Sequence, residues 1–352
     1  MTISPPGPHA VPTPDATAHG LPRPCGPISE AVVRALTAPP GRRRVPQPSD
    51  VRAVGDPLTD RDFQLGLWML YEMHFRGFDD VDPFLEWDPL LLAARRSLEM
   101  VFERALRELA EPDDDLPTSA DEVTTALLRV TTDATEPALA AYLAREATED
   151  QFRAYLAQRA VFHLREADVE CLLLARLSGA PKAALAEIQY DELGAGRADR
   201  LHADLFARAL ESLDMPTDIT TYVDGADATT LATVNAGTML NLHRRLRGAA
   251  AGHFAAFEAT SSVPCKLIAA GADRLGLPPE VATYYTEHVE ADSVHEQVAI
   301  NALCGELVAA DPTLGPDVLL GASICLAVHT VASDVMLAAW REGSAPEEEI
   351  AS

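Results

Sequence analysis

Two histidines and one aspartate recur at helical spacing in the stretch His288-Val-Glu-Ala-Asp292-Ser-Val-His295. The surrounding residues 281–303 contain neither proline nor glycine, which predicts one helix whose positions i, i+4 and i+7 share a face. Small or apolar residues hold both ends of that face, so we expect it to point into a core. Burying the polar trio in its middle is unfavourable unless a ligand or hydrogen bonds satisfy it. The face consists of Val281, Tyr285, His288, Asp292, His295, Ala299 and Ala302.

Two interpretations of this face compete. One is a buried His/Asp hydrogen-bond cluster, or a polar face whose helical phase has been misjudged. The other is a metal site, which three ligand-type residues bounded by apolar positions favour. Imidazole and carboxylate together suit Fe, Zn or Mn, and no thiolate is nearby to indicate a structural zinc.

A metal centre in a helical bundle needs ligands from several helices, and four further acidic or histidine residues lie on apolar stripes. Together with the first three they give three histidines and four carboxylates, more than one tetrahedral zinc can use. Such a set suits two irons with positions left open for O2. The Glu-x-x-His repeat of ferritin-type sites is absent. The four additional candidates are Glu166, Glu192, His202 and Glu258.

Alternatives to these candidates stay open at the level of sequence. Each carboxylate, taken singly, also fits a semi-buried salt bridge. A shift in helix phase would bring in three neighbouring residues, namely Glu187 for Glu192, His163 for His202 and His253 for Glu258.

Residues that support the ligands or bind a substrate are harder to select. Tyr285, Glu287 and Glu290 are the candidates to orient the imidazoles from a second shell. The run Arg244-Arg245-Leu-Arg247 is one option for holding a substrate carboxylate, although exposed helix arginines explain it as well.

The elements that must position these residues are almost all helical. Alanine and leucine outnumber β-branched residues and no convincing alternating run appears, so the chain is predicted to be all-α. We expect a Pro-rich, largely irregular segment over 1–57, accessory helices over 58–147, the ligand-bearing bundle over 148–342 and an acidic tail over 343–352. The helices of the bundle are predicted at 149–178, 181–194, 198–213, 228–261, 264–275, 279–309 and 313–342.

Composition restricts the function. The formal net charge is −26, and an acidic surface repels phosphate backbones and anionic lipid, so neither nucleic acid nor a membrane is expected as a partner. No apolar run is expected to reach the roughly 20 residues of a membrane helix. Five scattered cysteines without a CxxC pair and the lack of a basic-then-apolar N-terminus predict a cytoplasmic protein.

The His-x3-Asp-x2-His element and the order of the carboxylates before it resemble the haem-oxygenase-like di-iron oxidases. Further stretches resemble the branch described as iron-containing redox enzymes, and the resemblance covers roughly 60–340. This resemblance implies a haem-oxygenase-like helical bundle that binds two iron ions, activates O2 and needs no haem. It matches Glu166, His202, Glu258, His288, Asp292 and His295 to the core ligands, and Glu192 to the extra carboxylate of N-oxygenating members. The stretches are Leu70-Tyr-Glu-Met-His74-Phe-Arg-Gly77, Leu164-Arg-Glu166-Ala-Asp168, Glu187-Ile-Gln-Tyr-Asp-Glu192 and Glu287-His-Val-Glu-Ala-Asp292.

The expected function is therefore a non-haem di-iron oxygenase that uses O2 on a small amine- or amino-acid-like metabolite, by N-oxygenation in a biosynthetic pathway. Oxidative C–C cleavage or desaturation at the same site is one alternative, and a metal-free binding protein on the same bundle is another. A haem enzyme is disfavoured because the surplus carboxylates would face an anionic cofactor. We expect an external electron donor, or the substrate itself, to supply reducing equivalents; the oligomeric state stays open, with a homodimer as one option.

Overall fold

The computed structural model describes residues 19–39, 41–110, 117–132 and 137–343; for residues 48 and 290–293 it describes the backbone but not the side chains. Every regular element in these ranges is helical and none is a strand, which confirms the predicted all-α class. The α-helices are α1 (Pro27–Thr37), α2 (Pro48–Arg52), α3 (Arg61–Glu72), α4 (Pro89–Leu109), α5 (Ala120–Thr132), α6 (Ala138–Arg145), α7 (Glu149–His163), α8 (Asp168–Leu174), α9 (Gly179–Glu192), α10 (His202–Glu211), α11 (Ile219–Val223), α12 (Ala228–Leu242), α13 (Arg247–Leu275), α14 (Pro279–Gln297), α15 (Glu306–Ala310) and α16 (Gly315–Gly343).

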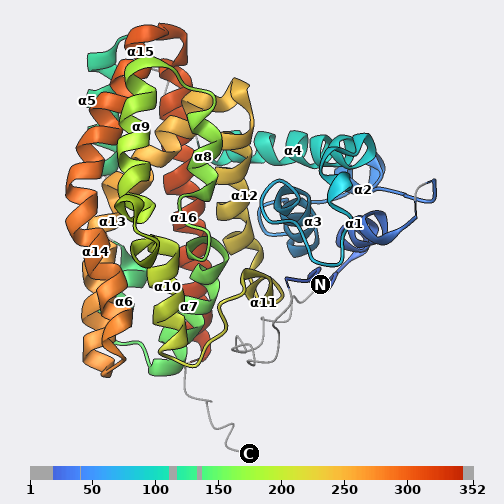
Figure 1. The fold of residues 1–352 in the computed structure, drawn as a ribbon, viewed down its shortest axis with the longest axis horizontal. Helices are drawn as coiled ribbons and strands as arrows, with labels where there is room; N and C mark the ends of the chain where they lie inside the picture. Colours follow the sequence, from blue (N-terminus) through green and yellow to red (C-terminus); the bar gives the residue numbers. More distant parts are fainter. Residues whose placement is uncertain (1–18, 40, 111–116, 133–136, 344–352) are drawn as a thin grey trace, which may run out of the picture.

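The long helices stand side by side in a bundle, and α1 to α4 project from one side of it (Figure 1). Within the bundle, α13 packs against both α14 and α16, while α3 attaches the projecting helices to α12. Helices α5 and α6, which the sequence placed among the accessory helices, pack on α16 and α13 and so belong to the bundle.

Two glycines allow α13 and α16 to approach with their backbones in contact. A Cβ atom added at Gly252 would lie 1.8 Å from the carbonyl oxygen of Val318, and one added at Gly321 would lie 1.9 Å from that of Ala249. No other residue fits at such a crossing without moving a helix. The crossing fixes α13, which carries Glu258.

The segment expected to be largely irregular contains a packed helix. In α1, two backbone N–H groups, of Ile28 and Ser29, each donate a 2.8 Å hydrogen bond to the carboxylate of Asp62 on α3. This carboxylate satisfies the exposed helix N-terminus from outside the helix, so a Pro-rich stretch can still hold a short helix. The apolar residues that α1 buries are Ile28, Val32, Ala35 and Leu36.

Several predicted helix boundaries were wrong. The helix predicted over 149–178 is broken between α7 and α8, where Ala167 adopts a left-handed conformation with φ of 72°. The single helix predicted over 228–261 is interrupted at His243, which is extended. Pro264, predicted to be a break, lies inside α13. Proline removes one helical hydrogen bond, but the packing of α13 on both sides outweighs that local loss.

The chain after the predicted ligand stripe also departs from a uniform α-helix. From α14 it continues as a π-helical segment over Val298–Gly305 before α15 begins. Wide turns of this kind are rare and are frequently found at functional sites.

The last helix overturns the expectation about membrane length. The segment Pro312–Glu342 is long and apolar enough to cross a membrane by length and composition, with a mean hydropathy of 1.7 in its most apolar window. Within that window 44% of the residues are buried inside the molecule, and α16 packs on α13 and α12. A core helix passes the same test, so the finding is weak evidence for a membrane span.

Candidate metal centre

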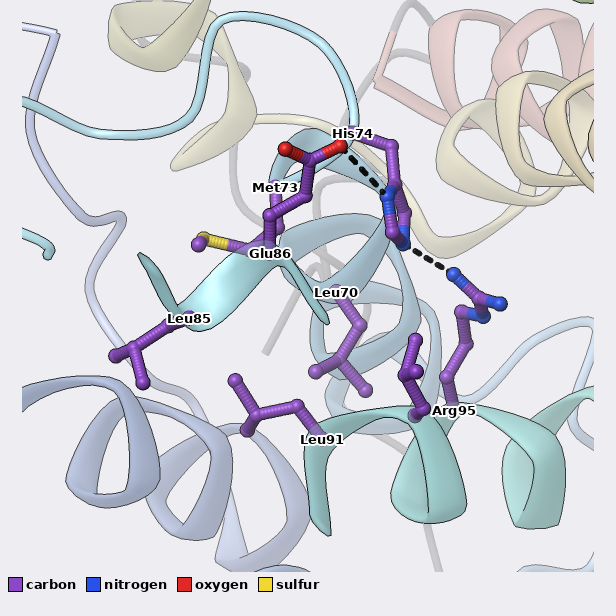
Figure 2. A pocket seen from close by; sticks show the side chains of 8 residues that line it. Leu70, Met73, His74, Leu85, Glu86, Leu91 and Arg95 are labelled. Atoms are coloured by element: carbon purple, nitrogen blue, oxygen red, sulfur yellow. Dashed lines mark hydrogen bonds and ion pairs between the residues drawn. The ribbon is translucent and has the colours of Figure 1, made fainter. Parts of the chain in front are cut away.

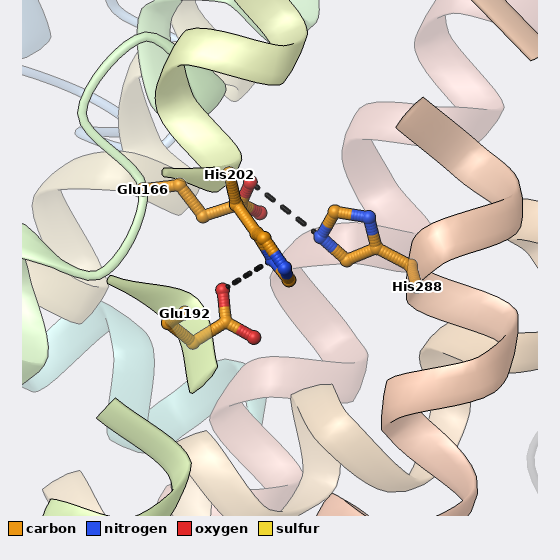
Figure 3. A group of neighbouring side chains, drawn as sticks. All are labelled: Glu166, Glu192, His202 and His288. Carbon is orange, nitrogen blue, oxygen red and sulfur yellow. Dashed lines mark ion pairs between the residues drawn. The ribbon is translucent and has the colours of Figure 1, made fainter. Parts of the chain in front are cut away.

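Six of the seven predicted ligands lie together in the bundle, in two groups that share one residue. In each group the ligand atoms lie within 4.8 Å of one another, and every residue is buried. Figure 3 shows the side chains of the first group pointing toward one another from separate elements. Glu192 belongs to both groups. The first group is Glu166, Glu192, His202 and His288, and the second is Glu192, Glu258 and His295.

The seventh predicted ligand, Asp292, lies on α14 between His288 and His295. Its side chain is outside the described part of the chain. Its role, like that of the other six as ligands, stays a prediction.

Regular helices place most of these side chains. His288 and His295 project from α14, Glu258 from the middle of α13, and Glu192 is the last residue of α9. Glu166 is the exception, because it lies in the turn that separates α7 from α8 rather than on the helical face predicted for it.

A tight loop brings His202 back to Glu192. His202 is the first residue of α10, and the loop from α9 begins at Gly194, whose φ of 74° favours glycine. A Cβ atom at Gly194 would also lie 2.8 Å from the backbone of Arg200 and Leu201. The close return of this loop sets the His202 Nδ1 atom 2.8 Å from the Glu192 Oε2 atom.

The ligand atoms of the second group lie farther apart than the His202–Glu192 pair. The Nδ1 atom of His295 lies 3.4 Å from Glu258 Oε2 and 3.6 Å from Glu192 Oε1. In the first group, the Nε2 atom of His288 lies 3.5 Å from Glu166 Oε2. These separations are those of ligand atoms arranged around a common centre.

Four atoms that face the two groups are buried without a hydrogen-bond partner among the described residues. They lie near carboxylates or imidazoles but not in hydrogen-bonding geometry, and an unsatisfied buried polar atom requires an explanation. A bound metal ion would satisfy all four, and nitrogen with carboxylate oxygen is a donor set that suits iron. The residues present therefore fit a metal. The atoms are His202 Nδ1, Glu258 Oε2, His288 Nε2 and His295 Nδ1.

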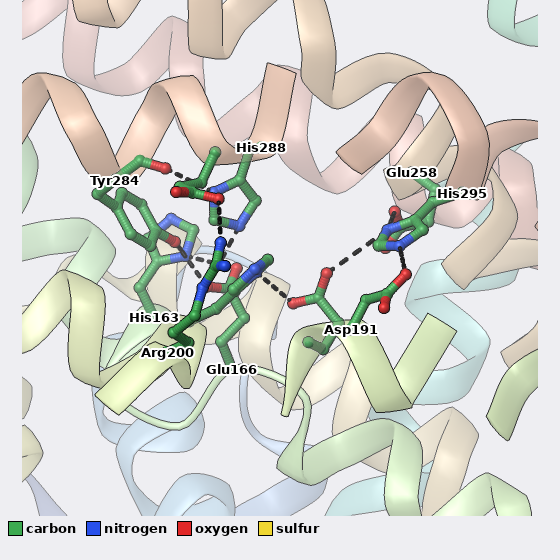
Figure 4. A network of polar contacts seen from close by, with 11 residues as sticks. His163, Glu166, Asp191, Arg200, Glu258, Tyr284, His288 and His295 are labelled. Atoms are coloured by element: carbon green, nitrogen blue, oxygen red, sulfur yellow. Dashed lines mark hydrogen bonds and ion pairs between the residues drawn. The ribbon is translucent and has the colours of Figure 1, made fainter. Parts of the chain in front are cut away.

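A second layer of hydrogen bonds orients the first group. The Nδ1–H of His288 donates to the backbone carbonyl of Tyr284 at 2.8 Å, which leaves Nε2 for a metal. The hydroxyl of Tyr284 donates to Glu166 Oε2 at 2.6 Å, and His163 Nδ1 lies 2.9 Å from Glu166 Oε1 (Figure 4). The Nε2 atom of His163 accepts a hydrogen bond from Arg159 Nε at 3.2 Å. The proton of this imidazole is therefore on Nδ1, which donates it to Glu166.

The predicted second-layer residues are not the ones that contact the ligands. Tyr285 is buried beside Tyr284, and among the described residues its hydroxyl has no hydrogen-bond partner. Glu287 pairs with Arg200 at 3.2 Å, and the side chain of Glu290 is outside the described part. On the second group, Asp191 takes this role, with its Oδ2 atom 3.4 Å from His295 Nε2.

The structure also separates the alternative candidates from the chosen ones. Glu187 is exposed on α9, so Glu192 is the carboxylate that faces the interior. His163 binds Glu166 instead of joining either group, and His253 is buried on α13 outside both groups.

Protonation in the metal-free protein follows from the crowding of carboxylates. Burial lowers the pKa of His288, but the charges of Glu166 and Glu192 outweigh it and raise that pKa to about 10. Burial likewise opposes ionisation of His295, whose pKa is raised to about 9 by its contact with Glu258. Burial raises the pKa of Glu258, and the neighbouring charge of Glu192 acts in the same direction. Without metal, protonated imidazoles therefore supply the positive charge that the carboxylates need.

Glu170 is a buried carboxyl that the sequence did not indicate. It lies on α8, one turn beyond the break that holds Glu166. Burial raises its pKa to about 8, and the charges of Glu258, Glu192 and Glu166 add to the effect. At neutral pH it therefore carries a proton and adds no further negative charge to the interior.

A small pocket elsewhere has no part in this centre. It lies between α3, α4 and the 3-10 turn Pro83–Trp87, in the projecting part of the molecule (Figure 2). Its polar wall is a chain in which Arg95 contacts His74 and His74 lies 3.4 Å from Glu86. None of its lining residues belongs to the two ligand groups.

An all-helical bundle with two buried His/Glu groups is the architecture of helical-bundle metalloproteins. The sequence profile of the iron-containing redox enzyme family matches residues 153–330, just over half of the chain. The chain belongs to this family, which confirms the resemblance to iron-containing redox enzymes and the haem-oxygenase-like fold that it implies. The matched range contains all seven predicted ligands.

Among solved structures, the chain is similar to that of a CADD-like protein of unknown function from Nostoc punctiforme PCC 73102. It is 18% identical, and the match covers 68% of this chain and 96% of that chain with a TM-score of 0.43. No curated protein matches the chain significantly.

Proposed function

We propose that this iron-containing redox enzyme is a non-haem di-iron oxygenase that uses O2 to oxidise the nitrogen of a small amine- or amino-acid-like metabolite. The observation that carries the proposal is the shared Glu192. Two His/Glu groups that share one carboxylate could each hold one metal ion, with the shared carboxylate between the two ions. A single-metal site would need only one such group.

The donor set supports iron at both positions. One group offers Glu166, His202 and His288 around Glu192, and the other offers Glu258 and His295, with Asp292 between them in sequence. When bound, two iron ions would supply the binding and reduction of O2. No cysteine belongs to either group, which argues against a structural zinc or an iron–sulfur cluster.

The protein's own part is to hold this donor set in place and to limit proton and water access. Tyr284 and His163 fix both oxygens of Glu166, so that this carboxylate cannot rotate freely. Glu170 holds a proton nearby at neutral pH, because its pKa is about 8. The burial of all six described ligands keeps the centre largely dry.

N-oxygenation is proposed, rather than C–C cleavage, on the strength of one residue. In the family that the sequence resembles, an extra carboxylate at the position of Glu192 accompanies N-oxygenation. Glu192 is buried and faces both groups, as that role requires, while Glu187 on the same helix is exposed.

The test loads the protein anaerobically with Fe(II), adds isotopically labelled O2 and a panel of amino acids and amines, and analyses the products by mass spectrometry. We expect a product with labelled oxygen on nitrogen, with wild-type protein and with Glu187→Gln. Glu192→Gln should lose it, because the shared ligand is gone. Products shortened by carbon loss would instead favour oxidative cleavage, and a wild-type protein that takes up no iron would favour a metal-free binding protein.

A further inference from the structure

One half-buried arginine of the bundle lacks an acidic partner among the described residues. Arg159 is half-buried on α7, and among the residues that the structure describes no carboxylate lies within ion-pair distance of its guanidinium. The two nearest arginines in sequence both have such partners: Arg153 pairs with Glu149 at 2.9 Å, and Arg165 with Glu72. The chain has 54 acidic and 28 basic residues, so an interior arginine left without an acid is not explained by a shortage of carboxylates.

Arg159 lies beside the candidate metal centre. Its Nε atom donates to His163, and His163 in turn binds the candidate ligand Glu166 at 2.9 Å. Its guanidinium carbon also lies 6.0 Å from the centre of the Phe162 ring. The Nε–H group of the Arg159 guanidinium is therefore fixed toward His163, and no described residue hydrogen-bonds to its two terminal nitrogens.

The surroundings of Arg159 are polar or aromatic but uncharged. Burial raises the pKa of Tyr285, and the charge of Arg159 opposes that rise. Burial lowers the pKa of His329, and the charge of Arg159 adds to that effect. Glu166 lies on the far side of His163 from Arg159, and it is already held by His163 and Tyr284.

We propose that Arg159 binds the carboxylate of the substrate, and that the substrate is therefore a small amino acid rather than a simple amine. The inference rests on the proposed N-oxygenation and names the substrate class of that same site. A guanidinium fork binds a carboxylate with two parallel hydrogen bonds, and its planar shape sets the ligand's direction. His163 links Arg159 to Glu166, so a carboxylate bound by Arg159 would lie one side chain away from the candidate metal centre. The bound carboxylate also supplies the counter-charge that Arg159 lacks.

The first experiment measures the reactivity of Arg159 directly. Phenylglyoxal, which condenses with accessible guanidinium groups, is applied to the full-length iron-loaded protein under anaerobic conditions, and the peptide containing Arg159 is quantified by mass spectrometry. The probes are a panel of L-amino acids and the corresponding amides, which differ only in the charge of the carboxyl group. At least one amino acid should protect Arg159 while its amide does not, and exposed Arg104 should be labelled equally throughout.

Calorimetric titration then compares the protecting amino acid with its amide on two variants. Arg159→Gln should weaken amino-acid binding about 10- to 100-fold, as expected for a lost charge-assisted pair, and should leave amide binding unchanged. Arg159→Lys should recover part of the affinity. Arg104→Gln removes the same charge from exposed α4 and should behave as wild type.

Three results would overturn the proposal. The first is that no amino acid protects Arg159, and the second is that amino acid and amide bind Arg159→Gln and wild type alike. The third is that Arg159→Gln loses iron in proportion to its loss of binding, because Arg159 would then act only through His163. If wild type takes up no iron yet binds amino acids through Arg159, the proposed oxygenase falls while the anion site stands.

Discussion

The hydroxyl of Tyr284 offers the sharpest test of how this chain holds its candidate ligands. It donates to Glu166 Oε2 at 2.6 Å inside the bundle, and Tyr284 is buried. A hydrogen bond to a charged group contributes about 1.5–3 kcal/mol, which corresponds to roughly a 10- to 100-fold change in an equilibrium constant. Second-layer changes at other metal sites reduce affinity over about the same range. We therefore expect Tyr284→Phe to weaken metal binding about 10- to 100-fold.

The assay is an anaerobic Fe(II) titration in competition with a chelator, with thermal unfolding of the metal-free protein as the measure of folding. Tyr285→Phe is the matched control, because it removes a hydroxyl from the neighbouring buried tyrosine that hydrogen-bonds to no described ligand. It should bind iron as wild type does. Equal affinities for Tyr284→Phe and wild type, or equal losses in both variants, would refute the conclusion that Tyr284 orients Glu166.

Three further predictions concern protonation and packing. Iron uptake at pH 7 should release about two protons, because the pKa values of His288 and His295 are about 10 and 9 without metal; calorimetry in buffers of different ionisation enthalpy measures this, and buffer-independent heats would contradict it. His19 has its pKa raised to about 9 by hydrogen bonds to two carboxylates, so its contribution to stability is complete below about pH 6.5 and is lost as pH rises through 9. His19→Gln should therefore lower the denaturant midpoint at pH 6 but hardly at pH 10, and equal losses at both would count against it. Gly321→Ala should lower the free energy of unfolding by about 1–3 kcal/mol or more, because its Cβ would meet a backbone carbonyl of α13 at 1.9 Å, while Gly55→Ala, with open space around it, should not.

Helical periodicity predicted the inward-facing positions of the candidate ligands wherever the chain is a regular helix. His288 and His295 lie on the inward face of α14 as their spacing predicted, and Glu258 does so on α13. The same periodicity separates Glu192 from exposed Glu187, because only Glu192 shares a face with the apolar residues of α9. A period of 3.6 residues is a local property, so the sequence alone carries it.

The sequence predicted that Glu166 faces the interior, but it did not predict that Glu166 lies in a turn between two helices. The stretch Leu164–Ala167 contains no proline or glycine, so local propensity favours a continuous helix. The break is supported by distant residues: Tyr284 binds Glu166, and Glu72 pairs with Arg165 from α3. Such contacts between residues far apart in sequence cannot be derived from the pattern of one segment.

Tertiary contacts also explain two other helices that local preference disfavours. Proline predicted a break at Pro264, yet packing against α14 and α16 keeps α13 continuous. Proline-rich composition predicted a largely irregular N-terminal segment, and the short helix α1 forms within it because Asp62 of α3 completes its first turn. In each case a tertiary contact outweighs a local preference of the order of a few kcal/mol.

In the proposed function, Glu192 joins two metal positions in one centre. This arrangement is tested most directly by anaerobic titration of the full-length protein with Fe(II), followed by metal analysis and Mössbauer spectroscopy of the loaded and O2-treated samples. We expect two irons per chain that become magnetically coupled after O2, and one iron or fewer in Glu192→Gln. A single uncoupled iron in wild type, or no iron at all, would contradict it.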